Sequence, residues 1–258
     1  MHGYLKSLFF YFTEAVPRGI ASDGIRGLYL ATCIYLLKIY PFKISIPKFS
    51  RVANLHEAEN YFDNFSLGQL RDDEIENHLS KQENPLVIDI GVNIGITVRW
   101  WHFLNGAAKV IGIDMISEAL DFTGRKLGSK ACWENWVPVC AAVSSEDKDI
   151  EINFDDPLLG TNSLSAKIGK EVRVVRARRL DSILSDYSLA KIDLIKIDVE
   201  GHAGEVLSGA GKFLHLAEYV VVETHGRQEI AKATKVLSDA GLYQYRLHGR
   251  MLWFSRAR

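Results

Sequence analysis

The stretch Leu86-Val-Ile-Asp-Ile-Gly-Val-Asn-Ile-Gly95 decides the fold. Its first half, Leu86–Ile90, is apolar, too short for a buried helix and bounded by Pro85 and Gly91, which favours a central parallel strand. Glycine at 91 and 95 permits unusual backbone angles and lets a ligand approach the backbone closely. We therefore predict a strand that turns through two glycines into a helix, whose free N–H groups face whatever lies over the turn.

The spacing of this turn indicates what the ligand could be. The motif that begins at Asp89 reads Asp-x-Gly-x-Asn-x-Gly, whereas the dinucleotide fingerprint Gly-x-Gly-x-x-Gly places a pyrophosphate on the helix N-terminus. A leading carboxylate suits a cationic or amine-bearing ligand better than a pyrophosphate. S-adenosylmethionine fits this chemistry because it carries an ammonium and a sulfonium and no phosphate. The alternative is a tight strand-to-helix turn that binds nothing.

A second apolar strand, Lys109–Asp114, ends in an acid about twenty residues beyond the glycines. An acid at this place can accept hydrogen bonds from both ribose hydroxyls of an adenosine. The alternative role for Asp114 is to cap the helix that begins near Ser117, and the two roles are compatible.

Composition limits the class of protein. A chain of 258 residues with 47% apolar residues can bury one sizeable core and carry an appended segment. The net charge of −1, without a basic stripe, argues against a nucleic-acid partner. The cysteines Cys33, Cys132 and Cys140 are odd in number and widely spaced, which argues against disulfides and a zinc site and fits a reducing, cytoplasmic compartment.

The N-terminal part is rich in apolar residues over Tyr4–Phe12 and Gly27–Ile46. The uncharged run Gly27–Leu37 is too short to span a bilayer, which needs about 20 apolar residues. We predict that 1–83 form a helical segment that packs on the core or makes a homo-oligomer face. A peripheral membrane contact is the alternative.

Residues 84–258 alternate between strand and helix patterns, which predicts one α/β domain with a mostly parallel sheet and right-handed crossovers. A C-terminal hairpin would add an antiparallel strand at the edge of the sheet. The expected strands are 86–90, 109–113, 136–142, 192–197, 219–223, 243–247 and 251–254, with extra strands at 151–154 and 172–175. The expected helices are 95–105, 117–127, 180–184 and 228–240, with another around Val206.

Taken together, these segments resemble the FkbM family of S-adenosylmethionine-dependent methyltransferases. The resemblance covers about 84–225, and its most specific part is the Lys-x-Asp-x-Glu-Gly block that begins at Lys196. The matching motifs are Val87–Gly95, the acid Asp114, Arg179-Leu-Asp-Ser-Ile-Leu184, Asp193-Leu-Ile-Lys-Ile-Asp-Val-Glu-Gly201, Val206-Leu-Ser-Gly-Ala210 and Tyr219-Val-Val-Val-Glu-Thr-His225. Membership would imply a Rossmann-like class I methyltransferase fold with seven strands. It would also imply methyl transfer, usually to a hydroxyl of a sugar, glycan or natural product.

The resemblance implies a cofactor site. Its first motif, which lines the methionine end of the cofactor, falls on Asp89, Gly91, Asn93 and Gly95. Asp114 matches the ribose-binding acid, although the family more often has Glu followed by Pro, where this chain has Met115 and Ile116. Met115 is placed to pack on the adenine, and Ala141, Ala142 and Ser144 fall where a loop flanks it. Gly160-Thr-Asn-Ser163 resembles a small-residue loop near the open face.

Candidate catalytic residues follow the fourth and fifth strands, because ligands bind beyond the carboxyl ends of such strands. Asp198, Glu200 and His202 follow the fourth strand, and Glu223 and His225 end the fifth. We predict that Asp198 and Glu200 orient the acceptor hydroxyl. His225 or His202 would take its proton, because imidazole titrates near neutrality. The plainer interpretation of each histidine is surface solvation or a helix cap.

Two further points concern this cluster. The family often has a second acid three residues after the Glu of its Glu-Gly pair. Here that position is Ala203, so any role of that acid is missing or falls to Glu205. Asp198 and Glu200 could offer oxygen ligands to Mg²⁺, but the sequence fixes no third ligand, and we predict no metal.

The sequence is also compatible with two other functions. One is a non-catalytic scaffold of the same fold that acts through its apolar N-terminus. The other is a nicotinamide-dependent oxidoreductase, which the glycine spacing and the leading Asp89 disfavour. The predicted partner is a small-molecule or glycan acceptor.

Overall fold

The computed structural model of the chain describes residues 44–46, 50–52, 60, 64, 70–127, 130–154 and 171–256. The chain divides into two units, 1–76 and 77–258. In the first unit, β1 (Ile44–Ile46) and β2 (Ser50–Val52) pair antiparallel. Apart from these strands, the predicted apolar segments of the N-terminus lie outside the described residues. None of the described helices is long and apolar enough to cross a membrane.

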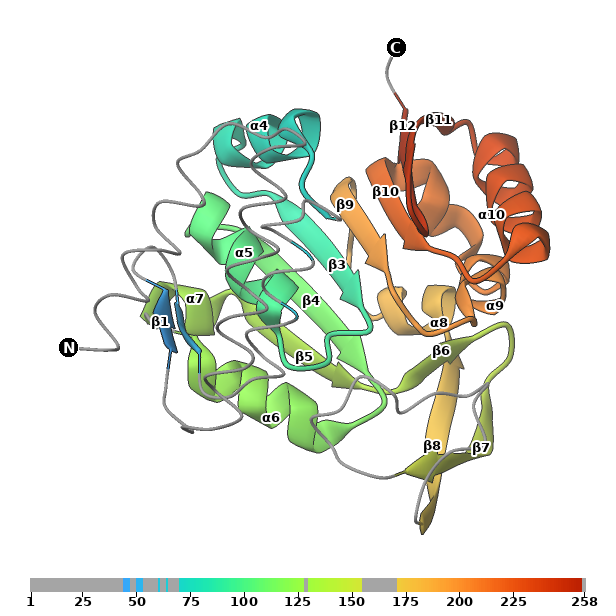
Figure 1. Cartoon of the computed structure of the whole chain (residues 1–258), viewed down its shortest axis with the longest axis horizontal. Helices are drawn as coiled ribbons and strands as arrows, with labels where there is room; N and C mark the ends of the chain where they lie inside the picture. Colours follow the sequence, from blue (N-terminus) through green and yellow to red (C-terminus); the bar gives the residue numbers. More distant parts are fainter. Residues whose placement is uncertain are drawn as a thin grey trace. The chain divides into compact units, whose positions relative to one another are not determined.

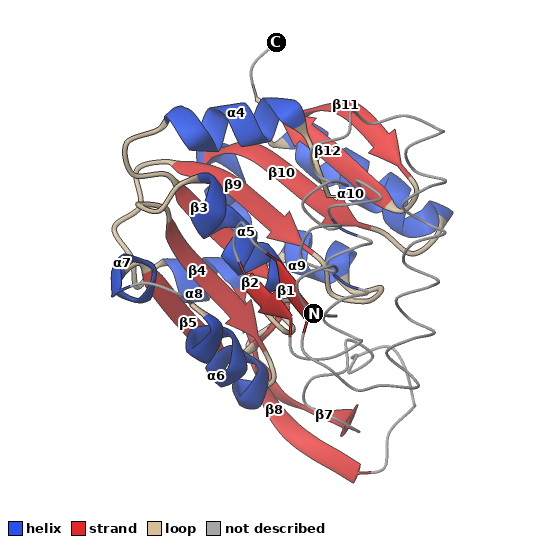
Figure 2. Ribbon diagram, turned by 60° about the vertical axis from the view of Figure 1, so that its left-hand side comes forward, coloured by secondary structure: helices blue, strands red, loops and turns tan. Residues whose placement is uncertain are grey.

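The second unit contains a seven-stranded sheet in the order β11-β12-β10-β9-β3-β4-β5 (Figures 1 and 2). Its parallel strands are β3 (Leu86–Ile90), β4 (Lys109–Asp114), β5 (Trp136–Cys140), β9 (Ile192–Ile197) and β10 (Ala217–Glu223). This confirms the predicted mostly parallel sheet. The hairpin strands β11 (Tyr243–His248) and β12 (Met251–Ser255) complete it. The antiparallel strand lies one place in from the edge, because β12 pairs with both β10 and β11.

The helices connect these strands, and those predicted within 84–258 are confirmed to within one or two residues. Helix α5 (Ile96–Leu104) contacts β3 and β4, and α6 (Ser117–Lys126) contacts β4 and β5. The remaining elements are α4 (Asp73–Lys81), α7 (Lys130–Glu134), α8 (Leu180–Leu184), α9 (Ala203–Ser208), the 3-10 helix η2 (Gly211–Leu216) and α10 (Arg227–Asp239). After α10, Gly241 has the left-handed backbone expected of a residue that ends a helix.

The predicted strand at 136–142 is divided in the structure, and the strands predicted at 151–154 and 172–175 are longer than predicted. The segment expected at 136–142 splits at Ala141, because β4 ends at Asp114 and offers no further residues to pair with. The Ala141 N–H donates to the Asp114 carbonyl, and the chain then leaves the sheet. A second sheet follows in the order β6-β8-β7, made of β6 (Ala142–Ser144), β7 (Lys148–Phe154) and β8 (Glu171–Arg179).

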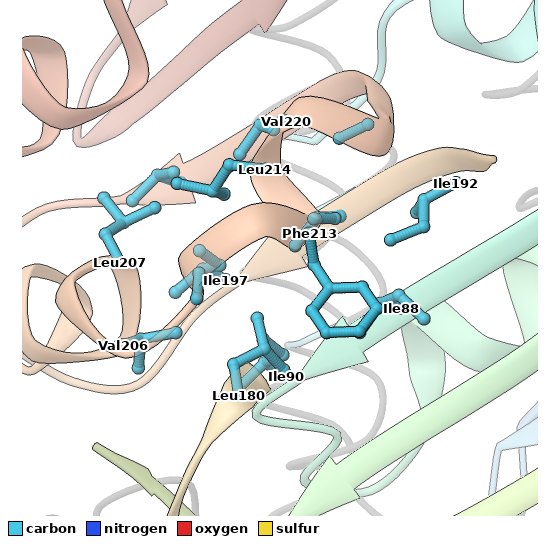
Figure 3. Close-up of a cluster of buried hydrophobic side chains, with 14 of the residues drawn as sticks. Ile88, Ile90, Leu180, Ile192, Ile197, Val206, Leu207, Phe213, Leu214 and Val220 are labelled. Carbon is cyan, nitrogen blue, oxygen red and sulfur yellow. The ribbon is translucent and has the colours of Figure 1, made fainter. Parts of the chain in front are cut away.

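The main core lies on one face of the seven-stranded sheet. Alternate residues of β3, β9 and β10, including Ile88, Ile197 and Val220, pack with Val206 of α9 and Phe213 of η2 (Figure 3). The intervening residues of the same strands point to the opposite face, because side chains alternate along a strand. That second face includes Asp89 and Lys196 as well as apolar residues.

The buried histidine of α5 gives a prediction for stability. His102 is 6% exposed with neither ring nitrogen hydrogen-bonded, and burial lowers its pKa from 6.5 to about 4. The unfolded chain therefore binds more protons between these pKa values, so stability should fall as the pH drops through this range. From about pH 7.5 to about pH 5 this should remove about 2 kcal/mol of the free energy of unfolding.

His102→Leu should abolish that part of the pH dependence, because an apolar side chain of similar size does not titrate. Urea unfolding at the two pH values measures it in both proteins. An equal loss of stability in wild type and variant would contradict the assignment.

Candidate active site

The glycine turn after β3 has a left-handed backbone at three positions: Gly91 (φ 80°), Asn93 (φ 50°) and Gly95 (φ 71°). The Gly91 N–H donates to the Ile113 carbonyl of β4 at 2.9 Å, which fixes the start of the turn. A Cβ atom on Gly91 would lie 1.7 Å from the carbonyl oxygen of Asp198. Residue 91 is therefore glycine because the end of β9 packs directly on the turn, as well as for its backbone angle.

Asp114 is joined to this turn by hydrogen bonds. Its Oδ2 accepts the Asn93 N–H at 2.8 Å, and its Oδ1 accepts the Ile116 N–H at 2.9 Å. Burial raises the pKa of Asp114, and the two backbone hydrogen bonds oppose that rise. Its carboxylate bonds the N-cap residue of α6, Ile116, rather than the first turn of the helix. Each oxygen has a further lone pair with which it could accept a ligand hydroxyl.

Asp89, predicted to line the cofactor, is fully buried beneath the turn. Its Oδ2 accepts the Trp101 indole N–H of α5 at 2.9 Å, and its Oδ1 lies 3.2 Å from Lys196 Nζ. The structure therefore gives Asp89 two protein partners, and one of them is a charge.

Lys196 connects the two sides of the site. Asp89 and Lys196 are paired residues in the register of β3 and β9, so their side chains meet on the same face of the sheet. Lys196 is 2% exposed, donates from Nζ to the Gly91 carbonyl at 2.7 Å and lies 3.5 Å from Asp198 Oδ2. Burial would lower the pKa of Lys196, but the neighbouring carboxylates of Asp89 and Asp198 outweigh it and raise the pKa. One charged lysine therefore contacts both the turn and the carboxyl end of β9.

Acidic groups and a histidine meet at the ends of β9 and β10. His225 Nε2 lies 3.3 Å from Glu223 Oε2 and 3.6 Å from Glu200 Oε2. Burial and the adjacent Asp198 raise the pKa of Glu223 to about 9. Desolvation would raise the pKa of Asp198, but Lys196 and the hydrogen bond with Glu223 lower it overall. Near neutral pH this pair of carboxyl groups therefore holds one proton and one negative charge.

Glu200 lies at the exposed side of the cluster, with a left-handed backbone (φ 47°). Burial and the charge of Asp198 raise the pKa of Glu200. One ligand atom from each of Glu200, Glu223 and His225 can lie within 4.8 Å of the others, so these three could hold a metal ion. The sequence had offered Asp198 and Glu200 as ligands. Sequence reasoning places Glu223 among the candidate catalytic positions but does not predict it as a metal ligand, because strand pairing decides which side chains it meets.

The other predicted residues lie in different places. His202 Nε2 is 3.1 Å from Ser144 Oγ of β6, and burial lowers the pKa of His202. Met115 packs against a small cluster that contains Ile116 and Phe154. Ala142 is buried at the start of β6, and Gly160–Ser163 lie outside the described residues.

The strand order, the glycine turn and the terminal acid of β4 define a Rossmann-like fold of the class I methyltransferase type. Residues 89–252 match the family described as the methyltransferase FkbM domain. The chain therefore belongs to the FkbM-domain methyltransferases, and the cofactor of this family is S-adenosylmethionine.

Two curated relatives are similar to this chain. The hexuronic acid methyltransferase AglP of Haloferax volcanii is 30% identical, over 62% of this chain and 64% of its own length. The methyltransferase sdnD of Sordaria araneosa is 27% identical, over 55% of this chain and 66% of its own length. The chain thus spans slightly less than two thirds of each relative.

Solved structures with a similar chain path include methyltransferases. Fibrillarin of Aeropyrum pernix, in complex with S-adenosylmethionine, has a TM-score of 0.43 at 12% identity, over 68% of this chain and 67% of that one. A TehB-like S-adenosylmethionine-dependent methyltransferase of Corynebacterium glutamicum has a TM-score of 0.40 at 13% identity, over 79% and 100%. Nothing about activity follows from resemblances at these scores.

The buried lysine gives a second prediction. Lys196→Met keeps the length of the side chain but leaves Asp89 and Asp198 without their cation. We expect a loss of about 3–5 kcal/mol in the free energy of unfolding, the usual cost of breaking a buried ion pair. Urea denaturation measures it, with Lys191→Met as the matched control. Lys191 also pairs with an aspartate of β9, at 2.8 Å, but is half exposed, so its loss should cost less than about 1 kcal/mol. Equal effects of the two substitutions would contradict the role given to Lys196.

Proposed function

We propose that this chain is an S-adenosylmethionine-dependent O-methyltransferase that acts on a hydroxyl of a sugar, glycan or natural product. The observation that carries the proposal is the direct link, through Lys196, between the glycine turn and the carboxylate–histidine cluster at the ends of β9 and β10. A methyl donor and a hydroxyl acceptor must meet at such a place. The similarity to a hexuronic acid methyltransferase supports an acceptor of this kind.

On this proposal the cofactor is held by backbone and carboxylate groups. Gly91, Asn93 and Gly95 form the turn around its methionine end, with Asp89 and Lys196 fixing the turn from beneath. Asp114 accepts the ribose hydroxyls, and Met115, Ala142 and Ser144 flank the adenine. The two carboxylate oxygens of Asp114 fit an uncharged ribose, because they can accept its hydroxyl hydrogen bonds. When bound, S-adenosylmethionine supplies a methyl group made electrophilic by the attached sulfonium.

The residues at the strand ends would prepare the acceptor. Asp198 and Glu200 accept hydrogen bonds from its hydroxyls and orient one oxygen toward the methyl group. His225 takes the proton of that hydroxyl, which general base catalysis requires. His202 is the second candidate base, but its Nε2 faces Ser144 and burial lowers its pKa, which weakens it as a proton acceptor.

The proposed partners follow from this chemistry and from the charge. They are a small-molecule or glycan acceptor and, through the N-terminal segment, a second copy of the chain or the surface of a membrane. A nucleic-acid partner is not proposed, because the net charge is −1.

Calorimetric titration tests the cofactor assignment. We expect S-adenosylmethionine and its demethylated product to bind and NAD not to bind. Asp114→Asn should weaken the binding about tenfold to a hundredfold, because a charged hydrogen bond contributes about 1.5–3 kcal/mol. Asp121→Asn, on the exposed side of α6, is the control. Preference for NAD would favour an oxidoreductase, and failure to bind either compound would favour a non-catalytic scaffold.

A screen of hydroxylated sugars and natural products, read by the mass of the methylated product, tests the reaction. With any acceptor found, His225→Gln should lower kcat by about a hundredfold or more and leave cofactor affinity unchanged, because it removes the proton acceptor. The same substitution at the exposed His215 should leave kcat unchanged. A larger loss for His202→Gln than for His225→Gln would transfer the role of base to His202.

A further inference from the structure

The two nitrogens of His225 have different neighbours. Nδ1 lies 3.4 Å from Nη1 of Arg250, in the hairpin turn just before β12, and Nε2 faces Glu223. A guanidinium can only donate hydrogen bonds, so Nδ1 must accept this one. A neutral imidazole that accepts at Nδ1 carries its proton on Nε2, and the nearest acceptor of that proton is Glu223 Oε2 at 3.3 Å.

Both neighbours are held in place. The carbonyl oxygen of Arg250 accepts hydrogen bonds from the N–H of Thr224 at 2.9 Å and from its hydroxyl at 3.0 Å, which ties the hairpin turn to the end of β10. The backbone N–H of His225 donates to Glu229 Oε2 at 2.6 Å. The imidazole therefore lies between a fixed acid and a donor carried on a fixed backbone.

Glu223 is in turn held by a chain of charged groups. Its carboxyl group is hydrogen-bonded to Asp198, which pairs with the buried Lys196. Lys196 also contacts the Gly91 carbonyl of the glycine turn and the buried Asp89. The orientation of His225 is thus connected, contact by contact, to the backbone of the proposed cofactor site.

We propose that Glu223 is a positioning residue for His225: it accepts the Nε2–H and so leaves Nδ1 as the nitrogen that takes the acceptor's proton. This inference rests on the proposed function. The acceptor hydroxyl would donate to Nδ1 from the position that the Arg250 guanidinium occupies. The Arg250 side chain must therefore move when the acceptor binds. A base whose other nitrogen is fixed by an acidic partner is the arrangement that enzymes use to hold a histidine in one tautomer.

The methyl transfer and the proton transfer can be written with these residues. The acceptor oxygen forms a bond to the methyl carbon as the carbon–sulfur bond breaks and leaves its electron pair on sulfur. The hydroxyl proton passes to Nδ1 of His225 and then to solvent. The imidazolium formed on the way still donates from Nε2 to Glu223 Oε2 at 3.3 Å, and the Glu200 carboxyl group, 3.6 Å from Nε2, lies beside the new charge.

Substitution of Glu223 by an amide and by an apolar residue separates positioning from simple structural support. Glu223→Gln can still accept the Nε2–H through its amide oxygen and donate to Asp198 through its amide nitrogen. Glu223→Leu can do neither. Glu218→Gln is the control, since Glu218 lies at the other end of the same strand.

The first readout is the tautomer of His225, observed by long-range ¹H–¹⁵N NMR of protein labelled at histidine and assigned by comparison with His225→Gln. We expect the Nε2–H form in wild type, Glu218→Gln and Glu223→Gln, and loss of that preference in Glu223→Leu. This measurement needs neither cofactor nor acceptor, so it tests the inference even if the proposed function fails. An Nδ1–H form in wild type, or the same tautomer in Glu223→Leu, would overturn it.

The second readout is kinetic, with an acceptor from the screen. Glu223→Leu should lower kcat about a hundredfold with the KM for S-adenosylmethionine changed by less than about twofold, and Glu223→Gln should retain kcat within about tenfold. Equal losses for the two variants would contradict positioning by hydrogen bonding.

A metal titration tests whether the same side chains bind a cation instead. A cation held by Glu200, Glu223 and His225 Nε2 would require a lone pair on Nε2, which is the opposite tautomer. If Mn²⁺ broadens the His225 signals selectively and a chelator abolishes methyl transfer, the inference is overturned. Unchanged His225 signals on addition of Mn²⁺ support it.

Discussion

The site depends on a single buried cation. Lys196 is almost completely enclosed, and its charge is stable there only because Asp89 and Asp198 lie within 3.2 and 3.5 Å. A buried ion pair costs desolvation on both sides, so it seldom adds stability over apolar packing of the same volume. Its benefit here is geometric. The same ammonium group holds the Gly91 carbonyl, so the turn and the end of β9 keep one arrangement.

The charge balance of the cluster follows from this arrangement. Lys196 lies directly beside the carboxylates of Asp89 and Asp198, whereas Glu223 lies beside Asp198. Glu223 and Asp198 together retain one proton, because the pKa of Glu223 is raised and the pKa of Asp198 is lowered. A protonated acid can donate to Asp198 and still accept from His225. The histidine thereby has a defined partner without an additional negative charge in a poorly hydrated place. Electrostatics and hydrogen-bond geometry therefore select the same orientation of the His225 ring.

The glycine turn is closely packed against its neighbours. Gly91 has no Cβ because the Asp198 carbonyl occupies that volume, and Gly95 has none because Thr123 of α6 lies there. The turn is thus shaped by the neighbouring strand and helix as much as by any ligand. The Asn93–Asp114 hydrogen bond then fixes the acid of β4 against the turn, so that two motifs about twenty residues apart act as one surface.

The sequence by itself determined the strands, the helices, the parallel sheet and the position of the turn, because hydrophobic periodicity and glycine placement are local properties. It also placed Asp114, Asp198 and His225 at strand ends, and it failed at Ala141, where the end of a neighbouring strand stops the pairing. Only the tertiary structure decided the partners. The register of β3 and β9 brought Asp89 to Lys196, and the pairing of β9 with β10 brought Glu223 beside Asp198. Such contacts join residues that are far apart in the chain, and a local pattern contains no information about which strands become neighbours.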